Sequence, residues 1–258
     1  MEFKEITAGE STEFPAKVVL YGVPKIGKSR FASDADDVFF INIEGGLDYL
    51  GKKVRATPKI NSFDDVMAWM KHIYDTDSFT AGTIALDSLD WLETLSREKL
   101  VKQYGAKSIT DDSIVECQFY KAVSEASVNA AKVFKWLDAI YTKKGIKAIV
   151  IAHSEVKRID IPGKPPFERH QLKLYKELLA KTNEWADLIL FADYSYQVAG
   201  GGKNADKTAK GKTLSEPKPV LYAGGDVSFV GGGRMKLDKE LPLDYKQLYQ
   251  HITQTKGK

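Results

Sequence analysis

The segment YGVPKIGKSR, residues 21–30, decides the fold of this chain. Residues 22–29 match the pattern Gly-x-x-x-x-Gly-Lys-Ser/Thr at each fixed position, after an apolar run and before a helical pattern. Glycines let backbone N–H groups turn inward around an anion, and a helix that begins there points its positive end at the same anion. The segment therefore predicts a phosphate-binding loop. Its expected contact residues are Gly22, Val23, Pro24, Lys25, Ile26, Gly27, Lys28, Ser29 and Arg30.

Two side chains at the end of this loop carry specific expectations. Lys28 is expected to reach the β- and γ-phosphates of a nucleotide and to assist catalysis there. Ser29 is expected to bind Mg²⁺ through its hydroxyl. The sequence has no Asn/Thr-Lys-x-Asp motif of the kind that recognises guanine, so we expect ATP rather than GTP.

Short apolar runs around the loop predict the rest of the fold. They are continuous rather than alternating, which is typical of parallel strands that are covered by helices on both faces. Helical patterns lie between the runs, so the sequence predicts an α/β fold with a doubly wound, mostly parallel sheet. The predicted strands are residues 17–21, 38–43, 83–87, 147–152 and 187–192.

Three helices are predicted between these strands. Ser62 and Asp65 form a capping pair before the first helix, and a second helix is expected from Ser88 to about Tyr104. The third is expected to run without a break over residues 113–142 and to end at Gly145. Its predicted apolar face consists of Val115, Phe119, Ala122, Ala126, Val133, Leu137 and Ile140.

Composition argues against a polycationic protein, a disulfide or zinc site, and a membrane span. The 258 residues carry a net charge of only +3, so a nucleic-acid site would need local clusters of Lys and Arg. Cys117 is the single cysteine and cannot form an internal disulfide or a zinc site; we expect a buried or half-buried thiol. No stretch approaches the roughly 20 apolar residues of a membrane span, so we expect a cytoplasmic protein without a membrane partner.

Two carboxylates complete the expected nucleotide site. Asp87 ends a predicted strand and is the candidate Walker B acid that helps to hold the metal, although it also fits a helix N-cap. The residue after it is Ser88, whereas many NTPases carry a catalytic Glu there. Glu44 ends the neighbouring predicted strand, and the carboxyl ends of parallel strands line the ligand crevice. We therefore predict Glu44 as the general base.

Two segments interrupt the alternation of strands and helices. Residues 154–170 are rich in proline and charge, and we expect an irregular loop there. Residues 199–219 contain glycines and lysines with almost no large apolar side chain, which is typical of a mobile loop.

On these features the chain resembles the RecA-like branch of P-loop ATPases. The resemblance rests on the phosphate loop, on Glu44 followed by Gly45 after an apolar strand, and on a Walker B strand that ends Asp-Ser. Residues 150–192 and 232–248 are more closely similar to compact ATPases of phage recombination modules, which are minimal single-strand annealing proteins. The resemblance spans nearly the whole chain after residue 15. It implies one domain over residues 1–258, with residues 1–15 as an extension.

The resemblance also implies roles for two residues near the ends of predicted strands. His153 stands where RecA-like proteins carry a polar residue that senses the γ-phosphate and passes the signal to a DNA-binding loop; a plain hydrogen-bonded histidine is the alternative. Arg234 stands where related hexameric helicases place a Lys-x-Arg pair in the neighbour's active site. Gly232 occupies the first position of that pair, although Lys236 is a possible substitute, and a solvated arginine is the alternative reading.

Finally, the resemblance implies binding of single-stranded DNA at the two interrupting segments. Phosphate contacts by their basic side chains, with Phe167 stacking on a base, would be salt-sensitive and tolerant of sequence. The alternative is that these are ordinary solvated lysines. A homo-oligomer with ATP at the subunit interface is also implied, and a single-strand binding protein is a further candidate partner. The predicted DNA contacts are Lys157, Arg158, Lys164, Phe167, Arg169, Lys203, Lys207, Lys210 and Lys212.

Three other functions compete with an ATP-dependent, DNA-binding recombination protein. A P-loop small-molecule kinase usually needs an arginine-rich lid, and residues 199–219 contain no arginine. A helicase or packaging motor would be expected to keep the Lys-x-Arg pair. A nucleotide-gated protein that binds a partner and hydrolyses little ATP remains open.

Overall fold

The computed structural model describes residues 14–195, 198–199, 212–213, 216–235 and 237–254. In this part of the chain, one ten-stranded sheet runs in the order β12-β10-β7-β1-β5-β4-β2-β3, with β6 paired to β5 and β11 to β7. The pairs that join β7, β1, β5, β4, β2 and β3 are parallel, whereas β10, β11 and β12 are antiparallel additions. The predicted α/β fold with a mostly parallel sheet is confirmed.

The five predicted strands all form. They are β1 (Lys17–Gly22), β2 (Val38–Asn42), β4 (Thr83–Asp87), β5 (Lys147–Ile159) and β7 (Leu188–Ser195). The remaining described strands are β3 (Arg55–Ala56), β6 (Phe167–Leu172), β8 (Val198–Ala199), β9 (Lys212–Thr213), β10 (Lys218–Tyr222), β11 (Gly232–Gly233) and β12 (Glu240–Pro242). β8 and β9 pair only with each other.

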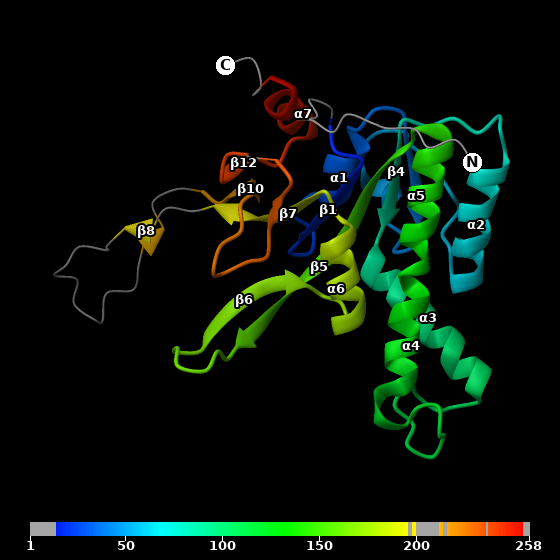
Figure 1. The fold of residues 1–258 in the computed structure, drawn as a ribbon. Helices are drawn as coiled ribbons and strands as arrows, with labels where there is room; N and C mark the ends of the chain where they lie inside the picture. Colours follow the sequence, from blue (N-terminus) through cyan, green and yellow to red (C-terminus); the bar gives the residue numbers. More distant parts are fainter. Residues whose placement is uncertain (1–13, 196–197, 200–211, 214–215, 236, 255–258) are drawn as a thin grey trace, which may run out of the picture.

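Helices cover both faces of the sheet (Figure 1). The α-helices are α1 (Lys28–Ser33), α2 (Phe63–Asp75), α3 (Leu89–Tyr104), α4 (Lys121–Ala130), α5 (Lys132–Lys144), α6 (Lys176–Trp185) and α7 (Tyr245–Gln254). Short 3-10 turns occupy Leu47–Tyr49 and Gln118–Tyr120.

Two apolar clusters explain why the strand sequences are continuous apolar runs. Side chains alternate between the faces of a strand, so Val19 and Tyr21 pack with α2, α3 and α5 on one face. Val18 and Leu20 pack with α1 and α7 on the other face. Both faces therefore exclude water, and polar residues have no place in these strands.

The prediction of one unbroken helix over residues 113–142 is wrong for residues 113–120, whereas the rest of the span forms α4 and α5. The chain forms turns and a 3-10 turn before α4, and Phe119 and Tyr120 have positive φ values of 53° and 59°. Val115 and Phe119, assigned to the buried face, are 63% and 86% exposed. Cys117 is buried as expected, but it lies in a turn.

The predicted irregular loop at 154–170 is also wrong. β5 continues past the core to Ile159 and pairs with β6 in an antiparallel hairpin from Ser154–Leu172 to Ile159–Phe167. This hairpin projects from the body of the protein (Figure 1). Proline and charge are tolerated because only residues 160–166 form the connection, at the exposed tip.

Within the described residues, none of the helices combines the length and apolar character needed to cross a membrane.

Candidate nucleotide site

The phosphate loop joins β1 to α1, as the motif predicts. Gly27 caps α1 with φ 112°, in the left-handed region where side chains are strained. Gly22 is required for a different reason. A Cβ atom there would lie 2.1 Å from the carbonyl oxygen of Ala192, so β7 leaves no room for a side chain. The two fixed glycines of the motif thus serve conformation and packing respectively.

The Lys28 side chain lies against the backbone of the phosphate loop. Its Nζ donates to the carbonyls of Gly22 at 3.0 Å and Val23 at 2.9 Å, and the residue is only 6% exposed. Burial lowers the pKa of Lys28, while the charges of Glu44 and Asp87 oppose this effect. An ammonium group held at this position by two carbonyls is available to a phosphate oxygen, a stronger partner.

Ser29 and Asp87 lie together, as predicted for a metal site. The Ser29 hydroxyl donates to Asp87 Oδ2 at 2.6 Å, and Asp87 is 3% exposed at the end of β4. Burial raises the pKa of Asp87 to about 6, against the lowering effect of the Ser29 hydrogen bond.

A hydroxyl and a carboxylate are hard oxygen donors, so this pair fits Mg²⁺. In the described residues, no group of three or more His, Cys, Asp or Glu side chains could hold a metal. Mg²⁺ usually keeps several waters and takes only one or two protein ligands plus phosphates, which matches the two oxygens present. A cation next to Asp87 would also compensate for the buried carboxylate.

Glu44 lies beside Asp87 and is held there by the backbone. The amides of Ile43 and Glu44 both donate to the Asp87 carbonyl at 2.9 Å. Ser88, joined to Asp87 by a cis peptide bond, donates through its hydroxyl to Glu44 Oε2 at 3.3 Å. The serine that replaces the usual catalytic Glu therefore holds the carboxylate predicted to do that work.

His153 lies between the loop and Glu44. In the sheet it pairs with Gly22, the first residue of the phosphate loop. Its Nδ1 lies 2.9 Å from Asp90 Oδ2, and its Nε2 lies 3.6 Å from Glu44 Oε1. The hydrogen bond to Asp90 is the main reason that the pKa of His153 is raised, although burial opposes it.

Asp90 is the site residue that the sequence reasoning missed. It lies in the first turn of α3, where an acidic residue is favoured by the helix dipole whatever its other role. The one signal was its position three residues after Asp87, and that spacing alone did not distinguish a functional carboxylate from a helix-stabilising one.

Arg234 lies at the other end of the sheet. Gly232 and Gly233 pair with Ile189 and Leu188, and the Arg234 guanidinium lies 3.5 Å from Asp187 Oδ1. The phosphate loop lies beyond the carboxyl end of the same sheet, four to five residues or about 15 Å along the strands. Arg234 therefore cannot join Lys28 in one chain. Lys236 lies outside the described residues.

The predicted DNA contacts fall in two segments of the chain, of which only the first is fully described. Lys157, Arg158, Lys164, Phe167 and Arg169 belong to the β5–β6 hairpin, where all but the last two are exposed. The Arg169 guanidinium donates to the Asp226 and Phe229 carbonyls at 3.5 and 3.3 Å, which fixes it against the segment between β10 and β11. Lys212 begins β9, while Lys203, Lys207 and Lys210 lie outside the described residues.

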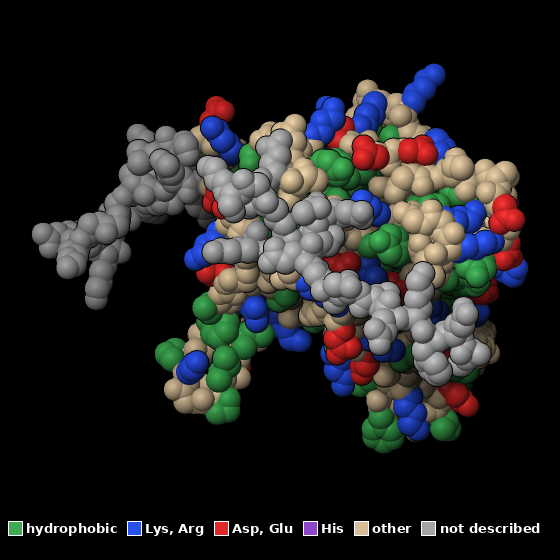
Figure 2. Space-filling view, turned by 45° about the horizontal axis from the view of Figure 1, so that its top comes forward, with side chains coloured by type: hydrophobic (Ala, Val, Ile, Leu, Met, Phe, Trp, Pro, Cys, Tyr) green, Lys and Arg blue, Asp and Glu red, His purple; other side chains and the backbone are tan. Residues whose placement is uncertain are grey.

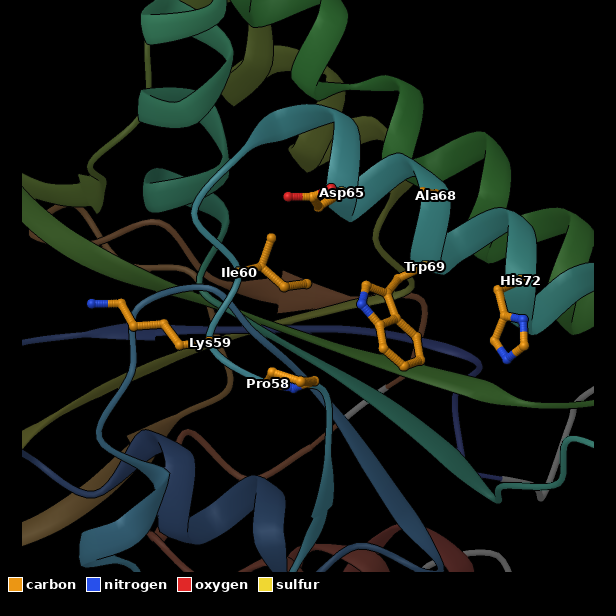
Figure 3. A pocket seen from close by; sticks show the side chains of 7 residues that line it. All are labelled: Pro58, Lys59, Ile60, Asp65, Ala68, Trp69 and His72. Carbon is orange, nitrogen blue, oxygen red and sulfur yellow. The ribbon is translucent and has the colours of Figure 1, made fainter.

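A separate pocket has a volume of about 470 Å³. It is formed by residues 58–60 and by Asp65, Ala68, Trp69 and His72 of α2 (Figure 3). None of the phosphate-loop residues lines it. The nucleotide site is therefore assigned from the loop and its carboxylates rather than from this hollow.

Comparison with known proteins agrees with this geometry. The family described as AAA domain matches residues 15–235, which include the loop, both carboxylates, His153 and Arg234. No curated protein matches the chain. Because the match covers most of the sequence, the chain belongs to the AAA domain family and is an ATP-binding P-loop NTPase.

Proposed function

We propose that this protein is an Mg²⁺-dependent ATPase that binds single-stranded DNA and promotes strand annealing or recombination. Its setting would be a phage or prophage recombination module in the cytoplasm of the host cell. The observation that carries the proposal is the course of β5. This strand pairs with β1 beside the phosphate loop, passes through His153 and continues into the projecting hairpin (Figure 1).

Residues of the site support the proposed ATP hydrolysis. In our mechanism, Glu44 accepts a proton from a water molecule as the water oxygen bonds to the γ-phosphorus. The bond between this phosphorus and the β–γ bridging oxygen breaks, which gives ADP and phosphate. Lys28 stabilises charge on the phosphate oxygens, and Ser29 and Asp87 would hold Mg²⁺, which supplies further charge stabilisation when bound.

The hairpin offers one face with the chemistry of a single-strand site. Cross-strand pairing places Lys157 opposite Arg169 and Ile159 opposite Phe167, so these four side chains share a face. Cations would contact phosphates, and Phe167 would stack on a base. Phosphate contacts of this kind tolerate any base sequence, as annealing of varied strands requires.

The position of Arg234 supports an oligomer. Since it lies at the far end of the sheet from its own phosphate loop, it would act on ATP only in a neighbouring copy. A head-to-tail arrangement of copies, with ATP at each interface, would bring the two together. A single-strand binding protein remains a candidate partner that delivers the DNA.

A specific observation favours a second candidate, a nucleotide-gated protein that binds a protein partner. Val156 is 54% and Ile161 39% exposed on the hairpin. Figure 2 shows hydrophobic side chains gathered with few cations on the projecting lobe at its lower left. An apolar tip of this kind suits a protein surface.

The deciding experiment measures ATP turnover with and without single-stranded DNA at low and high salt. Lys28→Ala, which removes the phosphate-binding ammonium, provides the blank. We expect DNA to stimulate turnover, and the stimulation to fade as salt rises because phosphate contacts release counterions. If DNA does not change ATP turnover and no salt-dependent DNA binding is found, the DNA proposal is refuted. A protein partner or a small-molecule acceptor is then favoured.

Paired substitutions locate the DNA contacts. We expect Lys157→Ala with Lys164→Ala to weaken DNA binding and to reduce the salt slope by about 1–2. Lys71→Ala with Lys132→Ala removes the same charge from helices α2 and α5 and serves as the matched control. Equal losses in the two pairs would mean that net charge, and not the hairpin, attracts the DNA.

A further inference from the structure

The two ends of the β5–β6 hairpin are joined to each other at its base. The Lys173 amide donates to the His153 carbonyl at 2.8 Å, just beyond the last paired residues of the hairpin. His153 is therefore the residue through which the hairpin leaves the core sheet, and Lys173 marks its return.

Helix α3 holds the outgoing end through Asp90. One carboxylate oxygen accepts the backbone amide of His153 at 3.1 Å, and the other lies 2.9 Å from its ring Nδ1. A carboxylate only accepts, so Nδ1 carries a proton and Nε2 faces Glu44. The Asp90 side chain is 12% exposed, so water competes little for these bonds.

The same helix holds the returning end through Glu93. This carboxylate, 4% exposed, accepts the Tyr175 amide at 3.2 Å, the Ser127 hydroxyl at 2.6 Å and Arg97 at 3.0 Å. Asp90 and Glu93 are three residues apart, so they lie on one face of α3. Helix α3 itself follows Asp87 with Ser88 as its N-cap.

We infer that Asp90 is a positioning residue that acts through His153, with Glu93 as the second anchor of the same clamp. The first turn of α3 fixes the backbone and ring of His153, so that displacement of the hairpin and occupation of the nucleotide site affect each other through this helix. The inference rests on the proposed function for the identity of the hairpin's ligand, whereas the clamp itself rests on the contacts above.

The effect of losing the clamp follows from these contacts. Asp90→Asn keeps an oxygen for the His153 amide but offers an NH₂ group or a neutral oxygen to the ring. The ring is then free to change tautomer and orientation, and the link between hairpin and nucleotide is weakened. Energetic coupling between two sites typically changes affinity about 5–150-fold, so the loss is measurable.

The first test is hydrogen exchange of backbone amides in the hairpin, with and without a non-hydrolysable ATP analogue and Mg²⁺. In the wild type we expect the analogue to change exchange of residues 154–172 by at least about fivefold. We expect Asp90→Asn to bind the analogue and to lose this response. Asp138→Asn, which removes a carboxylate near the opposite end of the sheet, should keep it.

A full response in Asp90→Asn, or none in the wild type, would overturn the inference. If Asp90→Asn does not fold, His153→Gln decides the matter, because it keeps the backbone amide and removes the ring bond. We expect a reduced response in that variant, and an unchanged response would overturn the clamp.

The second test separates this inference from the proposed function. Affinity for single-stranded DNA is measured with and without the analogue, in the wild type and in Asp90→Asn. We expect the analogue to change the wild-type affinity at least about fivefold and to leave the variant unchanged. Equal nucleotide effects in both would overturn the clamp, while DNA binding stands. No DNA binding by the wild type would refute the proposed function, and the exchange data would still test the clamp.

Discussion

At the scale of single residues, the site is organised around a carboxylate that is costly to bury. Asp87 is 3% exposed, and its hydrogen bond from Ser29 does not offset the loss of solvation. The pKa rises from 3.8 to about 6 as a result. A site that holds an only partly compensated carboxylate is prepared for a cation, and the free protein is less stable because of it.

Substitution of Asp87 tests this cost. A raised carboxyl pKa means that the folded chain binds the proton more tightly than the unfolded chain, so stability falls as pH rises from about 4 through about 6. Asn has no charge to bury. We therefore expect Asp87→Asn, without Mg²⁺ or nucleotide, to gain stability relative to the wild type, by up to about 3 kcal/mol at pH 7.5.

Urea unfolding between pH 4.5 and 7.5 in EDTA measures this difference. Asp160→Asn, an exposed carboxylate on the hairpin, is the control and should track the wild type at each pH. Parallel curves for Asp87→Asn and the wild type would show that burial does not perturb this group.

At the scale of elements, local signals predicted helix α2 well. Ser62 caps it by accepting the Asp65 amide at 3.1 Å, and the Ser62 hydroxyl donates to the Asp65 carboxylate at 2.6 Å. The same type of signal located α4 and α5 but failed for the residues before them. Periodicity continued through residues 113–120, but these residues form turns, and Phe119 and Tyr120 have positive φ values just before α4 begins.

The cap of α2 can be removed by one substitution. We expect Ser62→Ala to lower the free energy of unfolding by about 1 kcal/mol, because the Asp65 amide loses its acceptor. Ser78→Ala, at an exposed turn position, is the matched control and should change stability by less than about 0.5 kcal/mol. Thermal and urea unfolding measure both changes. Equal losses of stability in the two variants would show that the Ser62 cap does not stabilise α2.

At the scale of the whole molecule, the candidate catalytic residues of one chain lie at two opposite edges of the sheet. Lys28 and Glu44 lie at the carboxyl edge of the parallel strands, and Arg234 lies at the amino edge beside Asp187. No rearrangement of side chains brings these together across the sheet. A contribution of Arg234 to hydrolysis therefore requires a second copy.

Mixing two inactive variants tests that requirement. We expect Arg234→Ala to lower turnover at least about tenfold while ATP still binds, as for loss of a charge that stabilises the transition state. Lys28→Ala keeps Arg234 but lacks the phosphate contact. In mixed oligomers the intact loop of one variant meets the intact arginine of the other, so an equal mixture should recover roughly a quarter of wild-type turnover. No recovery would exclude action between copies, and full activity of Arg234→Ala would leave it a solvated arginine.

The sequence by itself determined the phosphate loop, the five core strands and the residues that end them. This is because motif spacing, continuous apolar runs and strand ends are local features that any parallel sheet must bring to one edge. Gly22, Lys28, Ser29, Asp87 and Glu44 were all predicted in this way, and they lie close together in the structure.

Only the tertiary structure decided how the site connects to the rest of the protein. Asp90 meets His153 across 63 positions of sequence, and Glu93 meets Tyr175 across 82. The hairpin forms because residues 167–172 pair with an extended β5. Proline and charge in the segment pointed to a loop instead, and the pairing between the two strands could not be read from the local sequence. Contacts of this kind depend on which elements become neighbours after folding, so the periodicity within one segment does not predict them.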